Sequence, residues 1–140
     1  MILDTSLLIA AERGDWDLPA FIQGREEEPF GLSVVSVAEL LHGVQRADSH
    51  KRRLKRTAYV EKIIELFPIY PFDLTAARIY AATWARLLAQ GLQVGAHDLM
   101  IASTALSLGF SVASADKRHF DKIEGLELEW IPAGSLKESP

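Results

Sequence analysis

The stretch MILDTSLLIA, residues 1–10, predicts a short buried strand that is followed at once by a helix. Ile2 and Leu3 form the expected strand, and the apolar run from Leu7 to Ala11 indicates one or two helical turns. Asp4 therefore stands where the strand gives way to the helix. Taken alone, this carboxylate could cap the helix or serve a function, and the local pattern leaves both open.

A second succession of strand and helix is predicted over residues 32–44. The segment Leu32 to Val35 ends in two β-branched valines, which favours a strand. The sequence SVAE that follows has the spacing of a capping box, in which Ser36 caps a helix and Glu39 bonds back to it. We expect this helix to reach about Val44.

Near the other end of the chain, two more acids occupy comparable positions. Asp98 is expected to begin a helix over residues 99–108, which Gly109 ends. Residues 110–114 then form a strand that leads directly to Asp116. Taken alone, Asp98 is an ordinary cap and Asp116 an ordinary turn acid.

Three capping residues predict the remaining helices. Asp17, with Pro19 in the first turn, is expected to open a helix through about residue 25. Ser49 begins a long helix whose apolar face includes Leu54 and which ends at Pro68, and Asp73 begins another. Short strands are expected at residues 69–70 and, at the sheet edge, 126–131.

Strands that alternate with helices predict an α/β fold, with a mainly parallel twisted sheet flanked by helices on both faces. The chain has 140 residues, which fits a single domain. We assign residues 1–131 to that domain and residues 132–140 to a polar C-terminal tail. Right-handed crossovers bring the junctions of strand and helix to one edge of the sheet.

The composition excludes several classes of protein. The absence of cysteine excludes disulfides, thiol nucleophiles, iron–sulfur clusters and cysteine-ligated zinc. The longest uncharged stretch, residues 99–115, has 17 residues of which only 11 are apolar, so it predicts core and no membrane span. The beginning of the chain lacks the basic region of a secretory signal, and we expect a cytoplasmic protein.

Four acids stand out because apolar sequence flanks each of them: Asp4, Glu39, Asp98 and Asp116. Gathered at one sheet edge, these carboxylates would repel one another, and a cation would remove that conflict. Oxygen ligands suit Mg²⁺ or Mn²⁺. The residues therefore predict a divalent-cation site held by these four carboxylates.

Short hydroxyl side chains lie beside these acids. Thr5, Ser6 and Ser114 could hold metal-bound waters, or they could make ordinary capping and turn bonds. The histidines show no paired metal spacing, so the sequence predicts no zinc site. Of these, His97 could orient Asp98, lie near the substrate or have a structural role.

The charge is unevenly distributed. The chain has a net charge of -4, which argues against indiscriminate nucleic-acid binding. From Arg46 to Arg56, however, six basic residues and one acid give a local charge of +5. Such a stripe can contact phosphates, but a solvated helix face is an equally good interpretation.

The stretches MILDTSLLIA, SVVSVAELLHGV, AHDLMIASTALSLGF and SADKRHF together resemble the four signature segments of the PIN-domain nucleases, specifically the small VapC toxins of toxin–antitoxin pairs. The resemblance covers residues 1 to about 131. Asp4, Glu39 and Asp98 match the three regular acids of the family, and Asp116 matches its more variable fourth. Ser114 stands where the family commonly has threonine.

This resemblance implies a Mg²⁺-dependent or Mn²⁺-dependent endoribonuclease that uses a metal-activated water. Asp4 and Asp98 would be the central ligands, Glu39 a ligand or water-positioning group, and Asp116 a ligand of a second or weaker ion. The expected RNA contacts are made by basic side chains of the stripe and beyond it: Lys51, Arg52, Arg53, Lys55, Arg56 and Arg118, with His119 near the scissile phosphate.

The implied partners are RNA, a VapB-like antitoxin and a second copy of the chain in a homodimer. An antitoxin would block the acids with an arginine, and the helices around Leu8 to Ala11 and Leu40 to Val44 are the candidate surface for its apolar segment. Two other functions remain open: a housekeeping PIN nuclease that acts on DNA or in RNA turnover, and an inactive PIN scaffold that binds RNA or protein.

Overall fold

The computed structural model describes residues 1–132, so of the polar tail expected at residues 132–140 only Pro132 is included. The helices and strands follow one another as β1 (Ile2–Leu3), α1 (Thr5–Glu12), α2 (Leu18–Ile22), β2 (Leu32–Ser33), α3 (Val34–Gln45), α4 (His50–Leu66), β3 (Ile69–Tyr70), α5 (Leu74–Ala89), α6 (Ala96–Leu108), β4 (Val112–Ser114), α7 (Lys117–Phe120) and β5 (Leu128–Trp130).

The strands are short and pair in parallel, as the sequence predicts. β4 lies between β1 and β5, and β2 pairs with β3. A parallel bridge between Ile2 and Gly31 joins the two sets of strands, and the Leu3 N–H donates to the Gly31 carbonyl over 3.0 Å. Glycine is required at this crossing because a Cβ on Gly31 would overlap the ring of Tyr70.

Helices cover both faces of the sheet, and adjacent residues of β1 show the division. Leu3 belongs to a buried cluster with Leu8 and Leu40, from α1 and α3. Ile2 belongs to a second buried cluster with Ile101, from α6. Successive side chains of a strand point to opposite faces, so this strand contributes to both cores. The predicted α/β fold is confirmed.

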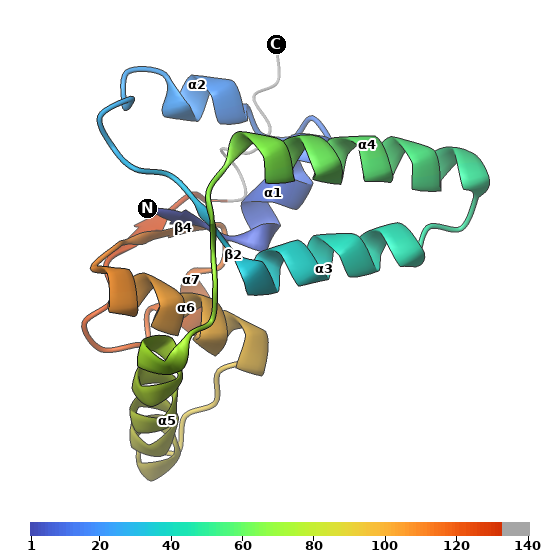
Figure 1. The fold of residues 1–140 in the computed structure, drawn as a ribbon. Helices are drawn as coiled ribbons and strands as arrows, with labels where there is room; N and C mark the ends of the chain where they lie inside the picture. The colour runs from blue at the N-terminus through green and yellow to red at the C-terminus, as the bar shows by residue number, and fades with distance from the viewer. Residues whose placement is uncertain (133–140) are drawn as a thin grey trace.

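The helices α3 and α4 run side by side as an arm that extends away from the sheet (Figure 1). At the base of the arm, Val60 and Ile63 are buried against the core. Leu54 lies farther out and is 58% exposed, so its expected place on the buried face is wrong. The outer half of α4 therefore lies outside the core, where its side chains can contact other molecules.

Three of the predicted helix caps are confirmed, and the capping box predicted for α3 is not. Asp17, Ser49 and Asp73 each accept a backbone N–H three residues ahead, as expected, although α2 ends at Ile22 rather than at about residue 25. The capping box is wrong: the cap of α3 is Ser33, whose hydroxyl accepts the Val35 N–H.

The beginning of α6 also differs from the prediction. The helix starts at Ala96, with Gly95 as its cap, and Asp98 lies inside the first turn. Its end at Gly109, which has a φ of 69°, is as predicted. No helix within residues 1–132 is both long and apolar enough to cross a membrane, and the uncharged stretch 99–115 is divided between α6 and β4.

A candidate metal centre at the edge of the sheet

Asp4 lies at the end of β1 and is held by two hydroxyl groups. Ser6 and Ser114 each donate to its Oδ2 over 2.7 Å, and the side chain is nearly buried. Although Asp4 occupies the cap position of α1, it accepts no capping hydrogen bond within the described part of the chain. The Asp4 carboxylate therefore accepts hydrogen bonds from these hydroxyls and does not cap α1.

Ser114 connects Asp4 to Asp116. Besides donating to Asp4, its hydroxyl accepts the Asp116 N–H over 2.9 Å. Asp116 caps the short helix α7, because its Oδ1 accepts the His119 N–H over 3.2 Å. Its Oδ2 lies 2.6 Å from Nδ1 of the same histidine. Two of the predicted acids are thus joined through one buried serine.

Asp98 approaches the same place from the first turn of α6. Its Oδ2 lies 3.2 Å from His119 Nδ1. Burial raises the pKa of Asp98 to about 6, and the charges of Asp4, Asp116 and Glu39 contribute to this rise while His119 opposes it. The other three predicted acids are therefore close enough to affect the carboxyl group of Asp98.

Glu39 comes from the middle of α3, on the other side of the site. Its Oε1 accepts the Thr5 hydroxyl over 2.9 Å, and its Oε2 lies 3.8 Å from His97 Nδ1. The bond from Thr5 replaces the capping-box bond that the sequence suggested. The hydroxyls of Thr5, Ser6 and Ser114 therefore share one arrangement, in which each holds a carboxylate directly.

His119 also belongs to this cluster, although the sequence suggested only a place near the scissile phosphate. One atom each from Asp98, Asp116 and His119 lies within 4.8 Å of the others, an arrangement able to hold a metal ion. Carboxylates with an imidazole nitrogen are ligands of divalent cations, and the charges of Asp4, Asp116 and Glu39 act on Asp98 at this place. The donor set fits the expected metal. In the sequence, the three-residue spacing between Asp116 and His119 was the signal that could have indicated this contact.

The basic stripe lies beside this centre, along the arm. A groove of about 870 Å³ runs between α1, α3 and α4, and Glu39 and His97 lie in its wall. Its basic lining consists of three predicted residues and two that the sequence did not single out as RNA contacts: Arg52, Lys55, Arg56, Arg13 and Arg46. Within the described chain, the lining does not include Lys51, Arg53 or Arg118.

Two groove arginines also have partners in the protein. Arg52 forms an exposed ion pair with Asp48 at 3.0 Å. Arg56 donates to the Gly43 carbonyl over 2.9 Å, which ties α4 to α3. Ile9 and Leu40 line the groove as well, so both helices named as a candidate antitoxin surface contribute to it.

Comparison with known proteins agrees with this architecture. The PIN domain model matches residues 1–126. Ribonuclease VapC1 from Rickettsia felis is 34% identical over 131 residues, which cover 91% of this chain and 93% of that protein. VapBC-5 from Mycobacterium tuberculosis, a member of a family of toxin–antitoxin systems, superposes with a TM-score of 0.73 at 30% identity, covering 94% of this chain and 96% of that one.

A third relative shares the fold at lower identity. VapBC2 from Rickettsia felis, solved with a DNA fragment from its promoter, has a TM-score of 0.84 at 21% identity and covers 93% of this chain and 97% of that one. The domain match spans nearly the whole sequence, and the relative at 34% identity does so as well. The chain therefore belongs to the PIN domain family and, within it, to the VapC ribonucleases.

Proposed function

We propose that this chain is a metal-dependent endoribonuclease that acts as the toxin of a toxin–antitoxin pair. The observation that carries the proposal is the convergence of Asp4, Glu39 and Asp116 on Asp98, whose pKa they help to raise. The ribonuclease relatives and the toxin–antitoxin structures support both parts of it. We place the activity in the cytoplasm, where RNA and Mg²⁺ are both present.

The acids would hold Mg²⁺ or Mn²⁺, with Asp4 and Asp98 as central ligands. When bound, such a cation supplies a nucleophilic water and neutralises charge on the phosphate. Among residues 1–132, the hydrogen bonds to the Asp4 carboxylate both end on Oδ2, which leaves Oδ1 for the cation. Ser6 and Ser114 fix the direction of that oxygen, because both hold the other oxygen of the same carboxylate.

Glu39 is suited to orient the attacking water. Thr5 occupies its Oε1, so Oε2 is the oxygen that can accept a proton from water or contact a cation. Asp116 would complete the site as a ligand of a second or weaker ion. Its position depends on Ser114 and on the turn of α7 that it caps.

The groove along the arm is the proposed path of the RNA. Arg52, Lys55 and Arg56 line it at one end, and Glu39 and His97 lie in its wall beside the acids. Phosphates bound by these cations would lead the chain of nucleotides to the metal centre. Arg118 is exposed on α7 and lies two residues after Asp116 in sequence, so it is a candidate contact on the other side of the site.

The same groove is the proposed site of inhibition by a VapB-like antitoxin. Ile9, which is partly exposed, offers apolar surface for a short segment, and the acids offer a place for its arginine. We expect replacement of that arginine by alanine to restore cleavage by the copurified complex. Inhibition that survives the loss of every arginine in the antitoxin would rule out this mode.

A homodimer is the second proposed assembly. Three large apolar side chains on α5 are more than half exposed: Leu74, Trp84 and Leu88. Such a group on one helix is suited to a self-complementary contact. Light scattering would show a dimer for the wild type and a monomer for Trp84→Glu, whereas a dimer in both would place the contact elsewhere.

Cleavage of RNA by the purified chain is the direct test. Total RNA is incubated with and without Mg²⁺, and the ends are mapped by sequencing. We expect internal cuts with 5′-phosphates for the wild type and none for Asp98→Asn. Asp73→Asn removes the same charge at a helix cap outside the site, where asparagine caps equally well, and it should cut like the wild type.

The alternatives give different results in this assay. A housekeeping PIN nuclease acting on DNA would cut single-stranded DNA of the same sequence as well as RNA. An inactive scaffold would bind RNA and cut nothing. Equal rates for the wild type and Asp98→Asn would overturn the proposed site.

A further inference from the structure

His119 stands between two carboxylates of the candidate metal centre. Its Nδ1 lies 2.6 Å from Asp116 Oδ2 and 3.2 Å from Asp98 Oδ2. Around a cation that is ~2.1 Å from each ligand, neighbouring ligands of an octahedron are ~3 Å apart. The two separations lie on either side of that value, and one ligand atom of each of the three residues lies within 4.8 Å of the others.

The imidazole is also held in place before any ligand arrives. The His119 N–H donates to Asp116 Oδ1, so backbone and ring of one residue meet the two oxygens of one carboxylate. The next residue, Phe120, is fully buried and anchors α7 against the core. The side chain of His119 itself is 37% exposed, and a cation can reach it from solvent.

We propose that His119 is a metal ligand, which with Asp98 and Asp116 forms a cation position that prefers Mn²⁺ to Mg²⁺. Imidazole nitrogen binds first-row transition metals well, whereas Mg²⁺ favours oxygen ligands. This inference rests on the proposed function, because it takes the acids to be metal ligands. It adds a residue to the centre and assigns a metal preference to it.

The same contacts admit two other roles for the ring, and these predict different metal binding. If His119 is a cation that neutralises the two carboxylates, its removal strengthens the binding of Mn²⁺ and Mg²⁺ alike. If it only donates a proton to the substrate, its removal leaves the affinity for both ions unchanged. Only a ligand weakens Mn²⁺ binding selectively when it is removed.

The test measures Mn²⁺ bound to the full chain without RNA, so it does not depend on activity. Electron paramagnetic resonance gives the affinity, and its pulsed form detects nitrogen bonded directly to Mn²⁺. We expect such a nitrogen in the wild type and its loss in His119→Ala, with Mn²⁺ affinity reduced at least ~10-fold and Mg²⁺ affinity reduced less. Mg²⁺ affinity is obtained by competition with Mn²⁺.

Two further variants refine the result. His119→Asn places an amide oxygen near the position of Nδ1, so we expect Mg²⁺ binding close to that of the wild type, no nitrogen signal, and a smaller preference for Mn²⁺. His97→Ala removes the histidine beside Glu39, whose Nδ1 is 3.8 Å from Oε2, and should leave the nitrogen signal intact. Loss of the signal in this control would overturn the assignment to His119.

The remaining outcomes are also decisive. Mn²⁺ bound by the wild type with no directly bonded nitrogen overturns the ligand role of His119 and leaves the proposed nuclease intact. Unchanged or tighter Mn²⁺ binding by His119→Ala does the same. A wild-type chain that binds neither ion overturns the metal centre itself, and the proposed function with it.

Discussion

The hydroxyl of Ser114 donates a hydrogen bond of 2.7 Å to Asp4 Oδ2, although 110 positions separate the two residues in sequence. The contact arises because β1 and β4 are parallel neighbours, with Leu3 opposite Ala113. Asp4 and Ser114 each follow this pair by one residue, at the same edge of the sheet. The Ser114 hydroxyl therefore positions Asp4 by donating to its carboxylate, and it positions Asp116 by accepting the backbone N–H of that residue.

Replacing Ser114 should weaken the metal centre through the acids that it holds. Ser114→Ala deprives Asp4 of one donor and the Asp116 N–H of its acceptor, so we expect Mg²⁺ affinity and cleavage to fall by about 10-fold to 100-fold. Ser114→Thr keeps the hydroxyl and should retain most of both. Calorimetric Mg²⁺ titration checks the effect, and equal loss in both variants would indicate a packing defect instead.

The neighbouring serines of α3 provide a test of its true beginning. Ser33→Ala removes the cap of the helix, and we expect a loss of about 1 kcal/mol in the free energy of unfolding. Ser36 is fully buried, and its hydroxyl has no hydrogen-bond partner within residues 1–132. Ser36→Ala should therefore be neutral or slightly stabilising. Urea denaturation measures the free energy of unfolding of both variants. A larger loss for Ser36→Ala than for Ser33→Ala would mean that Ser36 caps the helix, as the capping box predicted.

The contrast between these serines shows what local sequence can predict. The succession of strand, acid and helix predicts the positions of Asp4 and Asp116 at one sheet edge, because parallel pairing with right-handed crossovers leaves few alternatives. Glu39 and Asp98 reach the same site from within α3 and α6. Ser33 and Ser36 are both competent caps, however, and the choice depends on a distant partner. β2 pairs through Leu32 and Ser33 with β3, and α3 begins immediately after this pairing.

The outward position of the arm and the contact between His119 and Asp98 could not be predicted from local sequence patterns, for a related reason. The apolar face expected on α4 included Leu54, but the outer half of this helix lies beyond the core and Leu54 is exposed. Whether the outer half of α4 meets the core depends on where the rest of the chain lies, which no short stretch of sequence contains. His119 shows its spacing to Asp116 in the sequence, but its second carboxylate comes from α6.

The raised pKa of Asp98 links stability, metal binding and pH. Its value of about 6 lies above the usual 3.8, so between these pH values the folded protein holds the proton more often than the unfolded chain does. The stability of the metal-free protein should therefore fall as pH rises from about 4 to about 6, and then level. Mg²⁺ competes with that proton, so its affinity should rise over the same interval by up to ~10-fold per pH unit.

Thermal melts in EDTA and in Mg²⁺ between about pH 4.5 and pH 8 measure both effects. Asp98→Asn has no proton to lose and should show a smaller dependence of melting temperature on pH. At neutral pH without metal, we expect this variant to be more stable than the wild type by about 1–2 kcal/mol, because it relieves burial of a charge among like charges. A variant that is less stable than the wild type at neutral pH would contradict this account.

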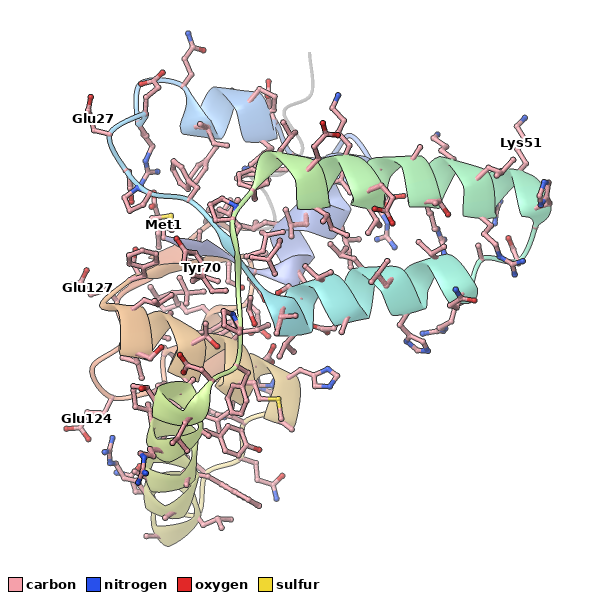
Figure 2. The ribbon with its side chains drawn as sticks, in the orientation of Figure 1. Met1, Glu27, Lys51, Tyr70, Glu124 and Glu127 are labelled. Atoms are coloured by element: carbon pink, nitrogen blue, oxygen red, sulfur yellow. The ribbon has the colours of Figure 1, made fainter. Side chains whose placement is uncertain are left out.

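The basic stripe offers a matched comparison on one helix. Arg52 and Lys55 line the groove, whereas Lys51 and Arg53 lie on α4 outside the lining, and Lys51 points away from α3 at the outer end of the arm (Figure 2). Arg52→Ala/Lys55→Ala and Lys51→Ala/Arg53→Ala each remove two positive charges from the same helix. Any difference between them reflects position and not net charge.

If RNA follows the groove, only the variant Arg52→Ala/Lys55→Ala should bind RNA poorly. Removing one phosphate contact lowers the slope of log affinity against log salt by ~0.7 for a single strand, so we expect a decrease of about 1.4 for the groove pair and little change for the outer pair. Fluorescence anisotropy in EDTA measures binding without cleavage, and Mg²⁺ affinity should be unchanged in both variants. Equal decreases in the two pairs would mean that α4 attracts RNA by its overall charge, and no decrease in either would return the stripe to a solvated helix face.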